Sequence, residues 1–414
     1  MLRAHSLTQA EAHRNVFICA AAAFSGYTGF TIVMPFLPLY IKELGVSDTS
    51  QVAMWAGLSL AATPAVTAVS APLWGRIGDR YGSKLLVIRS LLAFVFTKGA
   101  MAFVSAPWQL FALRALLGVF AGYGALTVSM AAESVPREEM PKAIGFVQMG
   151  QRLGPAVGPV IGGILAPLVG IRQSFLITAG FFLLATLLIA FFYKDPRTRR
   201  AETTPRSLRS VFSELVRTPG FVLLMTVIFA LQTVDRSFGP ILPLYVEHLG
   251  VGDARVAAVA GVLFSLAALA AALGHRVAHA LMAKFPARGL VTIAAIGAAA
   301  ALAITLLIPG VTTIAVALVV AGLGIGVGMT AAYSVAGHLL PADAHVTGFG
   351  LLTTASLIGL ALSPVIAGFL GASGLYLVFV FDVVLLVALA VIVWARMESA
   401  TPLQQSHVSD TFAS

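Results

Sequence analysis

Twelve runs of about twenty mostly apolar residues follow one another along the chain. A helix of about this length spans the hydrocarbon core of a bilayer. Because backbone groups find no water there, each run must satisfy its own hydrogen bonds as a helix. The predicted spans are 16–40, 51–73, 85–105, 108–131, 142–168, 172–193, 219–244, 255–279, 289–308, 311–335, 346–370 and 375–396.

The composition agrees with this interpretation. Hydrophobic residues make up 59% of the chain and charged residues 10%, whereas a soluble domain carries about 25% charged residues. A surface of this kind must face lipid, so the predicted fold class is an all-α membrane protein. The only cysteine, Cys19, lies within the first span and excludes an intrachain disulfide. No cleavable signal peptide is expected, because the first apolar run is too long for one.

Positive charge lies between alternate spans. The segment Lys194–Arg217 carries seven basic and three acidic residues, and smaller basic clusters occur near 76–84, 137–142 and 284–288. Cytoplasmic loops of membrane proteins carry such an excess of lysine and arginine. We therefore predict a multi-pass protein of the bacterial inner (plasma) membrane with both termini in the cytoplasm. This pattern accounts for the net charge of +9 without nucleic acid as a partner.

One segment of the sequence occurs twice, once in each half. MPFLPLYIKELGV, Met34–Val46, returns 205 residues later as GPILPLYVEHLGV, Gly239–Val251, and the same register relates Pro159 to Pro364. Six predicted spans lie in each half, so both halves enter the membrane with the same polarity. Parallel repeats of this kind are typical of transporters that bind their substrate between the halves. A chance similarity of one proline-rich segment does not explain a register that holds over some 130 residues.

The repeat predicts the domain organisation. We expect an N-terminal six-helix bundle at 1–194, a basic cytoplasmic linker at 195–218, a C-terminal six-helix bundle at 219–398, and a disordered cytoplasmic tail at 399–414.

The loop after the second span reads GRIGDRYGSK. Its glycines permit a tight turn between neighbouring helices, and its carboxylate can pair within the loop or lie against a helix N-terminus. An ordinary basic cytoplasmic loop would carry similar charges. The residues of this pattern are Gly75, Asp79, Arg80, Gly82 and Lys84.

The fifth span contains GFVQMGQRLGPAVGPVIGG. Glycines four residues apart line one face of a helix and allow another backbone to approach, and a proline within the span kinks it. Generic packing of small residues would explain two or three of these glycines, but not the whole pattern. Its members are Gly145, Gly154, Gly158, Pro159, Gly162 and Gly163.

These residues carry a family resemblance. The chain resembles, over its whole length, a twelve-helix member of the major facilitator superfamily in its drug/proton antiporter branch. GRIGDRYGSK is similar to the superfamily's signature loop, Leu110–Gly118 to its fourth-helix arginine motif, and Gly145–Gly163 to the antiporter motif of helix five. The matching loop of the second half, Ala280–Gly289, departs from the pattern because Lys284 stands where the first half has Asp79.

The resemblance implies roles for these motifs. Asp79 and its neighbours would latch the cytoplasmic side, the glycines and proline of helix five would form a hinge and seal between the halves, and Arg114 would help to couple protons. A structural ion pair is the alternative for Arg114, since an arginine within the membrane needs a partner or a cavity.

Acidic residues within the spans are the candidate proton carriers. Asp235 is the first candidate and Asp382 the second; a purely structural pair is the alternative for each. Because adjacent residues do not share a helix face, we expect Asp235 to find its partner on another helix rather than at Arg236. Embedded cations outnumber embedded acids, which favours neutral, zwitterionic or anionic substrates over cationic ones.

Several polar and aromatic residues are candidates for the lining of a cavity, although lipid-facing or core positions are the alternative for the aromatic ones. They are Tyr27, Phe30, Gln148, Gln151, Arg152, Gln232, Arg236 and Phe238. We expect no metal site, since no His or Cys cluster has ligand spacing, and no nucleotide cofactor, since no phosphate-binding GxxxxGK[ST] loop is present.

Taken together, these features predict a monomeric, proton-coupled exporter of small amphipathic molecules that works by alternating access, without enzymatic chemistry. The alternatives are a proton-coupled uptake symporter, a membrane sensor that keeps the fold without transport, and a channel.

Overall fold

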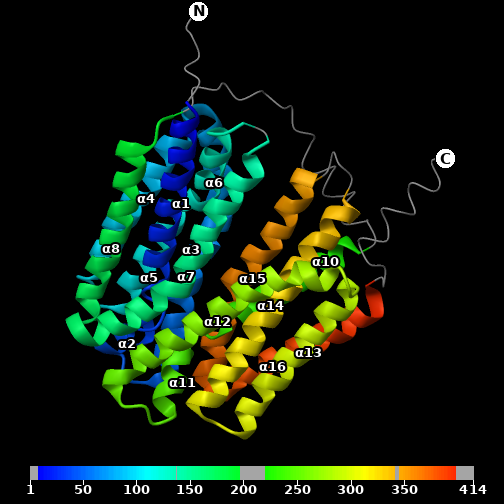
Figure 1. Ribbon diagram of the computed structural model, residues 1–414. Coiled ribbons are helices and arrows are strands. Elements are labelled where there is room, and N and C mark those ends of the chain that lie inside the picture. Colours follow the sequence, from blue (N-terminus) through cyan, green and yellow to red (C-terminus); the bar gives the residue numbers. More distant parts are fainter. Residues whose placement is uncertain (1–7, 137, 196–219, 341–344, 398–414) are drawn as a thin grey trace, which may run out of the picture.

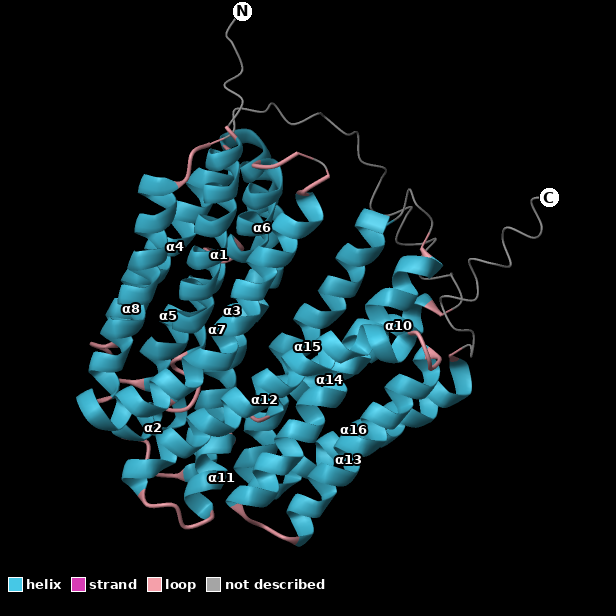
Figure 2. Cartoon of the chain, in the orientation of Figure 1, coloured by secondary structure: helices cyan, strands magenta, loops and turns pink. Residues whose placement is uncertain are grey.

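The computed structural model describes residues 8–136, 138–195, 220–340 and 345–397, apart from the side chains of 71–73, 75–76, 78–81 and 345–347. Every regular element within these ranges is a helix. The helices form two bundles, each with its own apolar core. The bundles meet at one end of the molecule and diverge toward the end from which both chain termini leave (Figures 1 and 2). We call these ends the loop side and the terminus side.

The first bundle contains the helices of the N-terminal half. They are α1 (Gln9–Thr31), α2 (Leu37–Glu43), α3 (Thr49–Tyr81), α4 (Ser83–Met101), α5 (Pro107–Val119), α6 (Tyr123–Glu133), α7 (Met140–Val169), α8 (Ile171–Leu187) and the π-helical extension η1 (Leu188–Phe192).

The second bundle contains the helices of the C-terminal half. They are α10 (Phe221–Ser237), α11 (Leu242–His248), α12 (Asp253–Met282), α13 (Ala287–Leu307), α14 (Val311–Leu339), α15 (His345–Ser373) and α16 (Leu375–Arg396). Each predicted span coincides with one described helix or with two consecutive ones, which confirms the predicted all-helical membrane fold. The predicted linker at 195–218 and tail at 399–414 lie almost wholly outside the described residues, so the domain boundaries stay predictions.

The proline-rich repeat breaks a helix in each half. In the first copy, α1 ends at Thr31 and α2 begins at Leu37; in the second, α10 and α11 are bent by 45° around the break. Proline lacks an amide hydrogen and clashes with the preceding turn, but it is well placed at a helix start. Pro38 and Pro243 accordingly lie at the starts of α2 and α11.

The turn between α3 and α4 is shorter than the sequence pattern predicts. Most of GRIGDRYGSK is helical, because α3 continues to Tyr81 and α4 begins at Ser83. Gly82 alone makes the turn, with a φ of 90° that glycine adopts without strain. The side chains of Gly75, Asp79 and Arg80 lie outside the described residues.

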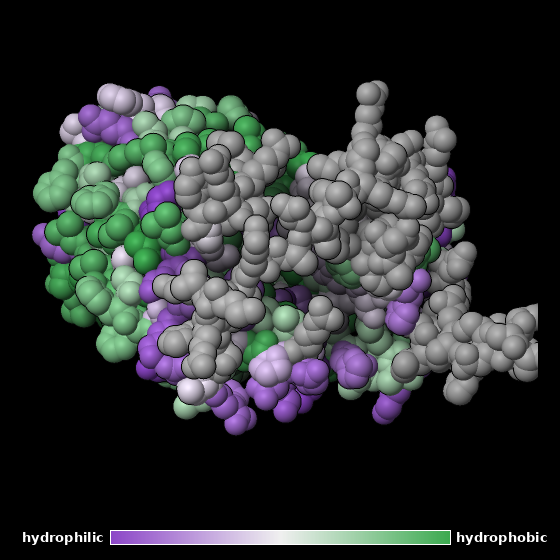
Figure 3. Space-filling view, turned by 90° about the horizontal axis from the view of Figure 1, so that it is seen from above, coloured by the Kyte–Doolittle hydropathy of each residue, from purple (hydrophilic) through white to green (hydrophobic). Residues whose placement is uncertain are grey.

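Length and hydropathy fit a membrane-spanning arrangement. Within the described residues, nine helices are long and apolar enough to cross a bilayer, and the bent pair α10–α11 adds a tenth. Large apolar side chains such as Phe103, Phe191 and Leu307 are more than three-quarters exposed. A view from the terminus side shows hydrophobic residues around the rim on the left, with hydrophilic patches between them (Figure 3). Lipid is the solvent that this surface requires.

The two halves pack together through glycines on the loop side. A Cβ on Gly163 of α7 would lie 2.5 Å from the carbonyl oxygen of Ala257 in α12, and one on Gly368 of α15 would lie 2.8 Å from that of Ala53 in α3. Such close approach of backbones needs residues without a side chain. On the terminus side, Gly145 at the opposite end of α7 has nothing within 4 Å of an added Cβ.

Candidate functional site

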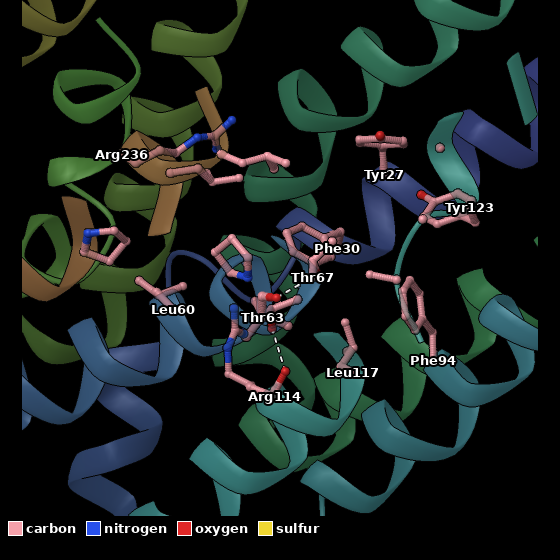
Figure 4. Close-up of a pocket in the computed structure, with 18 of the residues that line it drawn as sticks. Tyr27, Phe30, Leu60, Thr63, Thr67, Phe94, Arg114, Leu117, Tyr123 and Arg236 are labelled. Atoms are coloured by element: carbon pink, nitrogen blue, oxygen red, sulfur yellow. Dashed lines mark hydrogen bonds between the residues drawn. The ribbon is translucent and has the colours of Figure 1, made fainter. Parts of the chain in front are cut away.

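A cavity of about 290 Å³ lies between the two halves. Its walls come mainly from α1, α3, α4 and the α5–α6 break of the first half, and from α15 and the end of α10 in the second (Figure 4). The lining residues are Tyr27, Phe30, Val33, Met34, Leu60, Thr63, Pro64, Thr67, Phe94, Arg114, Leu117, Ala121, Gly122, Tyr123, Gly124, Ala125, Arg236, Gly239, Leu357, Leu360 and Pro364.

One wall of the cavity is a broken helix. The fourth predicted span divides into α5 and α6 at Gly122, whose φ is 114°. Non-helical backbone at membrane depth is tolerated where it lines a cavity. Its exposed carbonyl groups then serve as acceptors: Gln151 Nε2 of α7 donates to Gly124 O at 2.9 Å.

Arg114 is fixed at the floor of the cavity by its neighbour α3. Its Nε donates to Ser59 O at 2.6 Å, while Thr63 Oγ1 donates to the Arg114 carbonyl oxygen at 2.8 Å. The residue is 4% exposed, and within the described part of the chain it forms no ion pair. The guanidinium is thus oriented by a backbone carbonyl rather than by a carboxylate.

Aromatic side chains form the apolar part of the lining. The rings of Tyr27 and Tyr123 lie 5.5 Å apart between centroids, and Phe94 meets Tyr123 edge-on at 5.7 Å. Phe30 completes this group next to Thr63 and Thr67 in Figure 4. Edge-to-face contacts such as that of Phe94 with Tyr123 are a favourable arrangement for aromatic rings.

Asp235 and Arg236, neighbours in sequence, pair directly with each other. Arg236 Nε lies 2.9 Å from Asp235 Oδ2, although its N–H is not aimed at that oxygen. The expectation that Asp235 would pair with another helix is therefore wrong. The pair lies at the last turn of α10, which ends at Ser237. Gln232 Nε2 donates to Asp235 Oδ2 at 3.5 Å, and Gln232 Oε1 accepts from Ser356 Oγ of α15 at 3.1 Å.

Asp382 lies in the core of the second bundle rather than at the cavity. It is 0% exposed, and Ser237 Oγ donates to its Oδ2 at 2.5 Å. Its Oδ1 has no hydrogen-bond partner, and no cation pairs with it among the described residues. The carboxyl group is therefore held by a hydroxyl alone.

The predicted lining residues separate into two groups. Tyr27, Phe30 and Arg236 line the cavity. Phe238 does not, because it packs against Phe379 inside the core of the second bundle at a ring distance of 5.4 Å. Gln148 and Arg152 are exposed on α7 nearer the terminus side, Gln151 bonds to the α6 backbone, and Gln232 lies in the network around Asp235.

The helix-five pattern has two faces. Gly154, Gly158 and Gly162 pack on α1, where a Cβ on Gly154 would lie 2.7 Å from the amide nitrogen of Thr28. One step around the helix, Pro159 and Gly163 face α12 of the other half. The first face holds α7 within its own bundle, whereas the second lies at the junction between bundles.

Lys84 is the one cation of the loop pattern whose side chain is described. Its Nζ donates to Tyr193 O at 2.7 Å, which joins α4 to the end of η1 within the first bundle. Burial raises the pKa of the Asp195 carboxyl above its ordinary value, and the charge of Lys84 opposes that rise.

On the loop side the cavity is closed by the two short helices of the repeat. Lys42 Nζ of α2 lies 2.6 Å from Glu247 Oε2 of α11. The halves also touch on the loop side where α3 meets α15 and where α7 meets α12.

Sequence reasoning missed most of the cavity wall. Thr63, Pro64 and Thr67 of α3 and Leu357 and Leu360 of α15 line it without carrying charge. The detectable signal was the glycine-rich segment GVFAGYG, 118–124, which interrupts a predicted span at the place where the wall forms.

No group of three or more His, Cys, Asp or Glu side chains within the described ranges could hold a metal ion. Among the described residues that line the cavity, none is acidic.

Comparison with known proteins agrees with this architecture. The profile of the Major Facilitator Superfamily matches residues 19–314 and 258–412. A protein named "Multidrug resistance protein MdtG" from Proteus mirabilis is 33% identical over 258 residues, which are 62% of this chain and 64% of that protein. This chain thus matches less than two thirds of the length of that relative.

Two solved structures share the fold. A bacterial homologue of the human lysosomal transporter Spinster, in an inward-facing and occupied conformation, aligns with a TM-score of 0.75 at 18% identity over 95% of this chain and 98% of its own. The nucleoside transporter NupG aligns with a TM-score of 0.77 at 11% identity over 93% and 100%.

Proposed function

Because this chain belongs to the major facilitator superfamily, a family of membrane transporters rather than enzymes, we propose that it is a proton-coupled exporter of small amphipathic molecules. The observation that carries the proposal is a cavity lined by both halves and closed on the loop side by contacts between them. A cavity shared by two repeat-related bundles is the arrangement from which alternating access follows.

The closed loop side faces away from the cytoplasm in this proposal. The basic segments between alternate spans support a cytoplasmic location for both termini, and hence for the terminus side. The structure then represents a monomer in the inner membrane whose cavity opens inward, ready to take substrate from the cytoplasm or the inner leaflet.

The outward step requires the loop-side contacts to separate and the terminus side to close. We assign the hinge and seal to α7, because one of its glycine faces packs on α1 of its own bundle and the other on the backbone of α12 in the other half. Gly145, at the terminus end of this helix, stands free in the present conformation. The terminus-side latch from Gly75 to Lys84 remains part of the proposal and acts in the outward-facing state.

Proton coupling runs through Asp235 in this proposal. Its side chain is 30% exposed and pairs with Arg236, which lines the cavity. Protonation of Asp235 removes the charge that holds Arg236, so the arginine moves and the cavity changes its charge. Arg114 senses that change from the opposite wall, and Asp382 is the second candidate carrier.

Export is favoured over uptake by two observations. The glycine and proline pattern of helix five resembles the antiporter motif, and a relative carries the name of a multidrug resistance protein. Uptake symport would use the same fold and reverse the sign of the substrate flux.

Inverted membrane vesicles test the proposal. The vesicles are made acidic inside, and a pH-sensitive dye reports the gradient. An exported compound should dissipate the gradient in vesicles that contain the native chain, but not in vesicles that contain Asp235→Asn. Accumulation of the compound inside the vesicles gives its direction. Substrate-driven alkalinisation by Asp235→Asn equal to that of the native chain would refute the proton assignment, and compound loss driven by the gradient would indicate uptake.

A further inference from the structure

The charges at and behind the cavity wall do not balance. Arg114 lines the cavity, and Lys98 of α4 lies behind the lining ring of Phe30; they are 4% and 1% exposed. Within the described part of the chain neither cation forms an ion pair, and Asp235 is already paired with the lining residue Arg236.

Lys98 is placed by the aromatic wall. It follows Phe94 by one helical turn on α4, and its Nζ lies 5.6 Å from the ring centroid of Phe30. Both aromatic residues line the cavity. A cation against an aromatic face is partly stabilised, but the ring carries no charge that could neutralise it.

A buried cation is costly in a medium of low dielectric unless an anion compensates it. An arginine keeps its charge even when buried, so Arg114 cannot avoid the cost by losing its proton. The described protein offers the Arg114 guanidinium a backbone acceptor on α3, Ser59 O, but no carboxylate. The missing negative charge must then come from the molecule that fills the cavity.

We infer that the cavity selects amphipathic anions, with the anionic group at Arg114, the field of Lys98 reinforcing it, and the apolar body against the aromatic wall of Tyr27, Phe30 and Phe94. This inference rests on the proposed transport function, because it names the substrate class of the same cavity. It also assigns a role in specificity to Lys98, which does not itself line the cavity.

Binding at equilibrium tests the inference without requiring transport. The purified chain in lipid nanodiscs is titrated calorimetrically with three probes of one shape: 2-naphthalenesulfonate, 2-naphthylmethanol and 2-naphthyl-trimethylammonium. Protein-free nanodiscs correct for partition into lipid. We expect the sulfonate to bind at least about tenfold more tightly than the trimethylammonium probe. The positive charges of Arg114 and Lys98 attract the former and repel the latter in a medium of low dielectric.

Lys98→Met removes the charge while keeping an unbranched apolar side chain of similar length. The variant should therefore fold, which an unchanged elution volume in size-exclusion chromatography would show. Sulfonate affinity should fall about tenfold, Lys98→Arg should restore it, and naphthylmethanol affinity should not change. Lys284→Met, in the exposed turn between α12 and α13, removes the same charge outside the cavity and should leave all three affinities unchanged.

Tighter binding of the cationic probe than of the sulfonate, or an unchanged sulfonate affinity in folded Lys98→Met, would overturn the inference. The failure of the transport proposal looks different: the sulfonate would bind as expected while vesicles showed no coupled flux. If the vesicles exported only cationic compounds, the proposal of export would stand and the inference of anionic substrates would be refuted.

Discussion

Lys42 and Glu247 stand 205 residues apart, which is the register of the sequence repeat, and their side chains meet at 2.6 Å. Equivalent positions of the two halves thus carry opposite charges and contact each other across the axis that relates the halves. Each charge lies on the short helix, α2 or α11, that the proline-rich repeat creates. The two copies of the repeat therefore supply the two helices that meet on the loop side.

Removal of this pair should favour the outward-facing state. Both side chains are about one-third exposed, so the interaction contributes about 0.5–1 kcal/mol rather than the energy of a buried pair. Glu247→Gln should accordingly shift the ratio of outward- to inward-facing molecules two- to fivefold. Distances between spin labels on α2 and α11 would measure this shift.

The charge-swapped double variant Lys42→Glu with Glu247→Lys provides the control, since it restores attraction with both charges exchanged. It should return the distance distribution to that of the native chain. A native distribution in Glu247→Gln would mean that helix packing alone holds the loop side closed.

The two faces of α7 predict two different defects. Gly163 faces the backbone of α12 across the junction, so Gly163→Val should keep the loop side from closing and abolish transport, while the amount of folded protein stays near that of the native chain. Gly154 faces the α1 backbone within its own bundle, so Gly154→Val should lower the yield of folded protein. Fluorescence-detected size-exclusion chromatography and vesicle transport measure these two outcomes separately.

Gly145→Ala is the matched control, because nothing lies within 4 Å of the added methyl group. It should leave folding unchanged or improve it slightly, since alanine favours a helix over glycine. If Gly163→Val transported normally, the junction between α7 and α12 would have no part in the cycle.

The spans themselves were predictable because each must bury its backbone in lipid and therefore shows as an apolar run. The predicted spans 311–335 and 375–396 nearly match α14 and α16. The breaks were harder to predict. In lipid, an apolar run remains equally apolar on both sides of a break, so hydropathy does not mark Gly122 or the turn after Thr31.

The site was less predictable than the fold for a physical reason. The charged and aromatic candidates were chosen by residue type, and this found Arg114, Arg236, Tyr27 and Phe30. Which face of a helix points inward depends on contacts with helices far away in sequence. Phe238, only two residues after Arg236, consequently lies in the core of its own bundle instead of the cavity.

The left-handed break at Gly122 predicts a local cost of substitution. Its φ of 114° lies in the region that side chains rarely adopt, so Gly122→Ala should destabilise the protein by about 1–2 kcal/mol. A lower melting temperature of the detergent-purified protein would show this. Gly99→Ala, within α4 and with nothing near the added methyl, should not lower the melting temperature. Equal melting temperatures for both variants would mean that the break relaxes without strain.

Asp235 and Asp382 should differ sharply when each is changed to asparagine. Asp235 is partly exposed and holds an arginine of the cavity wall, so Asp235→Asn should abolish proton coupling while exchange of substrate across the membrane without a gradient continues. Asp382 is sealed within its bundle, and asparagine can still accept from Ser237, so Asp382→Asn should keep both coupled flux and exchange within about twofold of native. Parallel measurement of dye response and substrate exchange in vesicles separates the two activities. If Asp382→Asn lost coupling and Asp235→Asn kept it, the buried carboxyl of Asp382 would be the proton carrier.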